Sequence, residues 1–152
     1  MTGGQRAARA VSAGDVAALQ AALAAEHAAV YGYGVAGAHL HGRRRAAATA
    51  DWVAHQQARD ELSALLRSRA VQPVPAAVAY QLPEPVRSTR TAVALAVHLE
   101  DHVAAAYAGL VAVRDAAVRA LGAGQLRASA LRAAYWRGGS VAFPGLQEAQ
   151  LR

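Results

Sequence analysis

The chain has 152 residues, more than half of them apolar, and a formal net charge of +6. This length suits a single domain with a buried core, and the absence of cysteine excludes disulfides and thiolate metal sites. No stretch of about 18 uncharged apolar residues is present, which argues against a membrane span. The N-terminus also lacks the apolar run of a signal peptide, so we expect a cytoplasmic protein.

All 16 basic residues are arginine, in a chain that is rich in alanine. This combination is typical of a GC-rich genome, and the alternative is a surface for nucleic acid or phosphate. The arginines are spread along the chain, and the one run, Arg43 to Arg45, is expected in a loop without interleaved aromatic residues. We therefore do not expect nucleic-acid binding.

The first half of the chain predicts a flexible segment, 1–14, and two antiparallel helices, at about 15–41 and 46–70. Ser12 or Asp15 is the candidate cap of the first helix. Apolar residues recur at spacings of three and four in both helices, as on the buried face of a bundle helix. The first stripe contains Val16, Leu19, Leu23, Glu26, Val30 and Tyr33, and the second contains Trp52, His55, Arg59, Leu62 and Leu66.

Four prolines between Val71 and Ser88 exclude a continuous helix there and predict a long connection. Two further helices are expected, at about 89–114 and 116–137, unless the third runs on to Leu121. The segment 138–152 is expected to pack on the bundle. One long crossover between the second and third of four helices is the ferritin-like arrangement, so we predict an all-α, ferritin-like four-helix bundle.

Five stretches of the chain resemble a bacterial, alanine-rich ferritin-like domain family of unknown function. The similarity covers nearly the whole chain and implies a ferritin-like bundle without an established activity. The stretches are LQAALAAEHAAVYGYG (19–34), HQQARDELSALL (55–66), PVPAAVAYQLP (73–83), LEDHVAAAYAGL (99–110) and AAYWRGGSVAFPGL (133–146).

Glu26 and Glu100 occupy leucine-like positions on the apolar stripes of the first and third helices. A buried carboxylate costs several kcal/mol unless it is paired or bound to metal. Ferritin-like di-iron proteins use a glutamate on each of two helices and a Glu-x-x-His motif on each of the others. Glu26 and Glu100 match the two single glutamates of that pattern.

The other two helices depart from the di-iron pattern. Glu61 lies at the right depth on the second helix, but Ala64 stands where histidine is required, and His55 lies nearly two turns away. The fourth helix has no Asp, Glu or His between Ala116 and Gln147, and Ser129 and Arg132 are its nearest polar residues.

Apart from the case in which both glutamates simply reach solvent from the helix seam, two interpretations follow from this incomplete set. In the first, Glu26, Glu100, Arg59 and Arg132 form a buried charge cluster, and the protein is a non-catalytic structural or interaction module without a cofactor. In the alternative, Glu26, His55, Glu61 and Glu100 bind iron or manganese in an oxidase or oxygenase. The wide apolar helix faces predict a homo-oligomer, with a dimer the simplest case.

His98 and His102 are separated by four residues, the spacing with which two histidines of one helix can chelate a metal. They project from a different face than Glu100. Solvent exposure or a subunit contact is the simpler interpretation of this pair.

Overall fold

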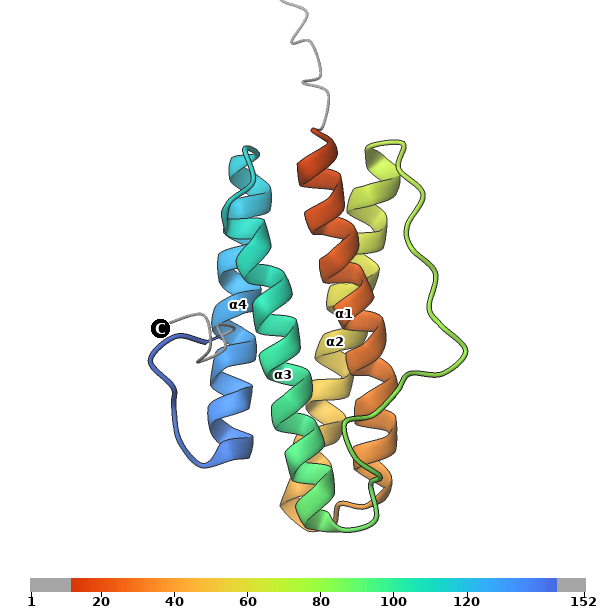
Figure 1. The fold of residues 1–152 in the computed structure, drawn as a ribbon, viewed down its shortest axis with the longest axis vertical. Helices are drawn as coiled ribbons and strands as arrows, with labels where there is room; N and C mark the ends of the chain where they lie inside the picture. The colour runs from red at the N-terminus through yellow and green to blue at the C-terminus, as the bar shows by residue number, and fades with distance from the viewer. Residues whose placement is uncertain (1–11, 145–152) are drawn as a thin grey trace, which may run out of the picture.

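The computed structural model describes residues 12–144, which form four α-helices and no strand (Figure 1). The prediction of an all-α four-helix bundle is therefore confirmed. Residues 1–11 of the expected flexible segment and 145–152 of the expected tail lie outside the described residues. The helices are α1 (Ala13–Ala38), α2 (Gly42–Ser68), α3 (Thr89–Val111) and α4 (Ala116–Arg137).

The bundle consists of two antiparallel helical hairpins, α1–α2 and α3–α4, joined by a long crossover along the outside of the first hairpin (Figure 1). Helix α3 packs against both α4 and α1, and α1 packs against α2. Helices α2 and α4 approach each other less closely. A cavity of about 420 Å³ lies between them, lined by Glu61 and Leu65 of α2 and by Val118 and Leu121 of α4, among others.

Polar side chains define the beginnings of three helices. Ser12 accepts a hydrogen bond from the backbone of Asp15, so α1 begins two residues before the expected position. Ser88 and Thr91 form a capping box at α3, and Asp115 accepts hydrogen bonds from the backbone of Ala117 and Val118 at α4. These side chains satisfy amide groups that have no partner within the helix itself.

The junctions differ from the sequence expectations by a few residues. Helix α2 begins at Gly42, about four residues early, so Arg43 to Arg45 lie in its first turn rather than in a loop. Arginine is a good helix former, which favours this extension. Helix α3 ends at Val111, and α4 continues through Gly122 and Gly124.

Two glycines let the helices approach closely. A Cβ atom at Gly32 of α1 would lie 2.6 Å from a Leu99 methyl carbon of α3. At Gly122 of α4, a Cβ would lie 2.6 Å from the Leu110 Cβ and 3.2 Å from the Tyr107 carbonyl oxygen. The small residues therefore set the spacing of α3 against both of its neighbours.

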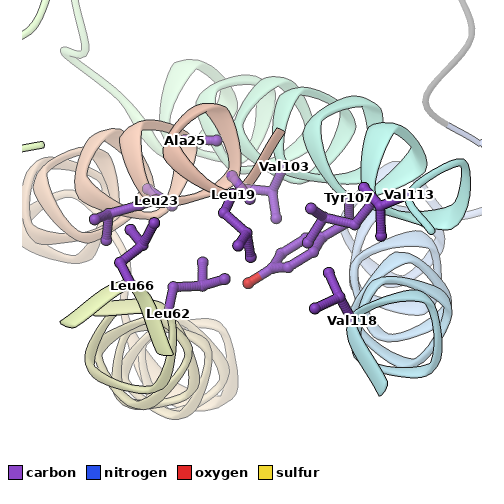
Figure 2. Close-up of a cluster of buried hydrophobic side chains, with 12 residues drawn as sticks. Leu19, Leu23, Ala25, Leu62, Leu66, Val103, Tyr107, Val113 and Val118 are labelled. Atoms are coloured by element: carbon purple, nitrogen blue, oxygen red, sulfur yellow. The ribbon is translucent and has the colours of Figure 1, made fainter. Parts of the chain in front are cut away.

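The buried apolar residues form one cluster toward each end of the bundle. Figure 2 shows the cluster that contains Leu19, Leu62 and Val103, with the Tyr107 ring extending from α3 toward α2. Tyr107 is the polar exception in this cluster, since its hydroxyl oxygen projects among aliphatic side chains (Figure 2). That hydroxyl belongs to the site described below.

The crossover is attached to α1 by side chains of that helix. The Gln20 amide donates to the Gln72 carbonyl at 2.6 Å and accepts from the Val74 backbone nitrogen at 2.8 Å. His27 lies 3.0 Å from the Val74 carbonyl oxygen through Nε2. Among the four helices of residues 12–144, none is long and apolar enough to cross a membrane.

Candidate functional site

Glu26 and Glu100 lie inside the bundle, with exposed fractions of only 1% and 0%. Glu26 comes from α1 and Glu100 from α3, and each interrupts an otherwise apolar helix face. Two buried carboxylates are stable together only when nearby donors and positive charge offset the cost of removing them from water. The surrounding side chains supply both.

His55 of α2 lies between the two glutamates and is itself 1% exposed. Its Nδ1 is 2.6 Å from Oε2 of Glu26, and its Nε2 is 2.9 Å from Oε1 of Glu100. A neutral imidazole carries only one N–H, whereas an imidazolium carries two. With a carboxylate oxygen at each nitrogen, the geometry is that of an imidazolium bridging two carboxylates.

Two buried tyrosines complete the carboxylate contacts in a crossed arrangement. Tyr107 of α3 donates a hydrogen bond to Oε1 of Glu26 at 2.7 Å. Tyr33 of α1 donates to Oε1 of Glu100 at 2.6 Å. Each helix thus contributes one glutamate and one tyrosine, and each tyrosine serves the glutamate of the other helix.

A second layer of polar groups lies beside Glu100. Asp51 of α2 accepts a hydrogen bond from the Trp136 indole at 2.8 Å and one from the Tyr33 hydroxyl at 3.3 Å. Arg132 of α4 lies between two carboxylates, with Nη1 3.6 Å from Glu100 and Nε 3.5 Å from Asp51. Arg132 and Asp51 are partly exposed, so this layer connects the buried site with the surface.

The charges of the site shift several pKa values. Burial alone would lower the pKa of His55, but the hydrogen bonds and charges of Glu100 and Glu26 outweigh it and raise that pKa to about 9. Burial, together with the charges of Glu100 and Glu26, raises the pKa of the Tyr33 and Tyr107 hydroxyls. Burial also raises the pKa of Asp51, against the hydrogen bond from Trp136. His55 is therefore charged at neutral pH, and both tyrosines keep their protons.

Two residues proposed from the sequence lie away from this cluster. Arg59 pairs with its neighbour Asp60, with Nη2 and Oδ1 2.8 Å apart, so the expected contact with the buried glutamates is replaced by a surface ion pair. Glu61 of the alternative metal set is exposed and lines the cavity between α2 and α4. The structure brings together Glu26, His55, Glu100 and Arg132, and it places His55 where the sequence hypothesis placed Arg59.

The donor set does not fit the di-iron pattern. Both nitrogens of His55 face carboxylate oxygens, which leaves no imidazole lone pair for a metal in this arrangement. The fourth wall presents the Arg132 guanidinium to Glu100, where a di-iron protein would present further carboxylates and histidine. Within residues 12–144, no group of three or more His, Cys, Asp or Glu residues is arranged to hold a metal ion.

The sequence hypotheses missed Tyr33, Tyr107 and Trp136 as hydrogen-bond donors of the site. Their aromatic rings are ordinary core residues by pattern. One signal was available for the tyrosines. Each follows a buried glutamate by seven residues, and this equal spacing on two antiparallel helices places each tyrosine level with the opposite glutamate.

The fold and site together define an all-α four-helix bundle with a buried cluster of carboxylates, histidine and tyrosines. The chain belongs to the family described as "Domain of unknown function (DUF4439)", whose model matches residues 18–148. It is similar to the crystal structure of a conserved hypothetical protein, rv2844, from Mycobacterium tuberculosis. The two chains are 34% identical, the match covers 84% of this chain and 97% of the other, and the TM-score is 0.81. Comparison with curated proteins finds no match.

Proposed function

We propose that this chain is a ferritin-like bundle in which a buried charge network takes the place of a metal centre. On this proposal it is a cytoplasmic structural or interaction module rather than an oxidase. The observation that carries the proposal is the position of His55, whose two ring nitrogens lie 2.6 and 2.9 Å from Glu26 and Glu100. An imidazolium at the centre of the site offsets one of the two carboxylate charges, and the Arg132 guanidinium lies 3.6 Å from Glu100.

The side chains around this centre support the same proposal. Tyr33 and Tyr107 hold both carboxylates by hydrogen bonds, and these bonds fix each carboxylate facing His55. Arg132 adds positive charge on the side of α4. The hydrogen bonds that join α1, α2 and α3 favour one arrangement of these helices, which is a structural role.

Metal analysis of protein purified without chelator tests the proposal. We expect iron and manganese well below one ion per chain, and no oxygen consumption on addition of ferrous ion. Stoichiometric iron or manganese that is lost in both Glu26→Ala and Glu100→Ala would contradict a metal-free centre. The Asp60→Ala variant is a suitable control, since Asp60 is an exposed carboxylate on α2 that contacts only Arg59 among the described polar groups.

A metal-dependent oxidase or oxygenase is the second candidate, and one observation favours it. Glu26, His55 and Glu100 are residue types that bind iron or manganese, and they meet from three different helices at one buried point, although their present contacts are with one another. Binding of iron or manganese would require His55 to lose a proton and to turn away from one glutamate. Iron that binds only above neutral pH, together with ferrous-dependent oxygen consumption, would favour this candidate.

We also propose that the protein is a homo-oligomer, with a dimer as the simplest form. Leu131 and Tyr135 lie one turn apart on α4 and are 57% and 56% exposed. Large apolar side chains that remain exposed at adjacent positions on one helix suit a contact with a second copy of the same surface.

A further inference from the structure

A second group of polar side chains lies on the side of α3 that borders α1 and the crossover, away from Glu100. His98 and His102 are both exposed, and their rings are nearly parallel, with an interplanar angle of 7° and centroids 6.4 Å apart. The same helix carries Glu100 between them in sequence, but that side chain is fully buried. The histidine pair therefore belongs to a surface separate from the buried carboxylate site.

Both histidines line a cavity of about 250 Å³ between α3, α1 and the crossover. The remaining walls are largely apolar and include Ala28 of α1, Leu95 and Leu99 of α3, and Leu82 and Pro83 of the crossover. Tyr80 and Gln81 add a phenol and an amide.

From this geometry we infer that His98 and His102 chelate one divalent transition-metal ion, of the zinc or copper type, at the mouth of the cavity. Two histidines four residues apart on one helix face can share a metal ion, and imidazole suits both metals. Binding at about 2.0–2.1 Å from each nitrogen requires the rings to swing toward each other, which exposed side chains can do. Water completes the coordination.

Neighbouring charged groups neither block nor complete the site. Asp101 lies between the two histidines in sequence, but its carboxylate is held by Arg137 at 2.6 Å. His27, on the facing helix, is bonded to the Val74 carbonyl. The metal would therefore have only two protein ligands, and positions would remain open for exchange with water or with a small ligand in the cavity.

Calorimetric titration of the untagged, full-length chain with zinc chloride tests this inference. We expect one zinc ion per chain. The single variants His98→Gln and His102→Gln should each weaken binding by a factor on the order of 10², because the second imidazole binds intramolecularly. His41→Gln is the matched control, since His41 is also exposed but has no histidine one turn away. Protons compete for the same nitrogens, so binding should weaken as the pH falls.

Side-chain NMR gives an independent measurement at the same sites. Zinc should shift the imidazole resonances of His98 and His102 and leave those of His41 and His55 in place. Equal zinc affinity in His98→Gln and the unchanged chain, or no heat of binding at millimolar zinc, would overturn the inference. The Glu26→Ala variant should bind zinc as the unchanged chain does, which separates this site from any metal in the buried cluster.

Discussion

Tyr107 of α3 donates a 2.7 Å hydrogen bond to Glu26 of α1, from a residue 81 positions away in the chain. The Tyr33 bond to Glu100 repeats this relationship in the opposite direction. The two bonds cross between the antiparallel helices α1 and α3, and His55 of α2 lies between the two carboxylates. Three helices are thus joined through one buried group of polar atoms, and this group determines most of the predictions below.

Replacement of His55 by alanine should destabilise the protein strongly. The change removes the positive charge between Glu26 and Glu100 and leaves two buried carboxylates facing each other. We expect a loss of about 3–5 kcal/mol in the free energy of unfolding, measured by urea denaturation. The control is His27→Ala, which removes one bond to a backbone carbonyl and should cost about 1 kcal/mol. Equal losses in the two variants would contradict the bridging role of His55.

The stability of the protein should fall as the pH rises from about 6.5 to 9. The folded state raises the pKa of His55 from 6.5 to about 9, so the stabilisation is complete below pH 6.5 and is lost as pH passes through 9. A tenfold change in proton affinity corresponds to about 1.4 kcal/mol. The rise in the pKa of His55 from 6.5 to about 9 therefore predicts a loss of about 3 kcal/mol in the free energy of unfolding at high pH.

Urea denaturation at several pH values measures this loss, and the variant His55→Gln is its control. The raised pKa of Asp51 also makes stability fall as the pH rises, and Asp51 is retained in the variant. The fall in stability above pH 6.5 should therefore be smaller in His55→Gln by the part that His55 contributes. NMR titration of the His55 ring carbon should give a midpoint near pH 9, and a midpoint near 6.5 would rule out the charged bridge.

The buried tyrosine hydroxyls should each contribute measurably to stability. Tyr107→Phe removes the donor to Glu26 while keeping the ring, and hydrogen bonds to charged groups contribute about 1.5–3 kcal/mol. Tyr135→Phe is the matched control, because the substitution keeps the ring and the Tyr135 hydroxyl has no hydrogen-bond partner among the described residues. Its loss should stay within about 0.5 kcal/mol. Thermal and urea unfolding of the two variants give the comparison, and indistinguishable stabilities would be inconsistent with the crossed bonds.

Two glycine substitutions within helices should have opposite effects. Gly122→Ala forces a Cβ to 2.6 Å from that of Leu110, and overpacking of this kind costs about 1–3 kcal/mol. Gly34→Ala adds a Cβ with no atom within 4 Å, so the gain in helix propensity should stabilise the protein by about 0.5–1 kcal/mol. The midpoints of thermal unfolding should move in opposite directions, and an unchanged or higher midpoint in Gly122→Ala would contradict the close α3–α4 spacing.

The proposed dimer should depend on the exposed apolar residues of α4. Leu131→Glu places a charge on a surface that the proposal assigns to a contact between copies. Light scattering coupled to size-exclusion chromatography should show a dimer for the unchanged chain and a monomer for the variant. Val53→Glu, at an exposed position on α2, is the control. A monomer in the unchanged chain, or a dimer in both variants, would show that this face of α4 is not the interface.

The four-helix architecture was predictable because its signals are local and repeated. Apolar residues at helical spacing, capping side chains such as Ser88 and a proline-rich connection each indicate an element without reference to distant residues. The ends of the helices were less predictable, as the early start of α2 at Gly42 illustrates. Residues at such ends are exposed on most sides, so their conformation depends on small differences in free energy.

The site was only partly predictable, because its members come from all four helices. Glu26 and Glu100 were recognisable as polar residues on apolar stripes, and Arg132 was placed by depth alone. His55 and Arg59 share one stripe of α2, so the replacement of Arg59 by His55 as the central positive group depends on the axial position of α2 against α1. Periodicity defines the apolar face of a helix but leaves its position along the axis open.

Helices α2 and α4 approach each other less closely than the other neighbouring helices, and this affects how the two hairpins can separate. Arg69 and Asp115 bridge the two hairpins at one end with a 2.6 Å ion pair, and Asp51 bridges them again through Trp136 and Arg132. The charges that bridge this side are partly exposed, whereas the polar contacts that join α1, α2 and α3 are buried beside apolar clusters. Dissolved ions screen partly exposed charges but leave apolar contacts intact. Ionic strength should therefore govern how readily the two halves of the protein part along this seam.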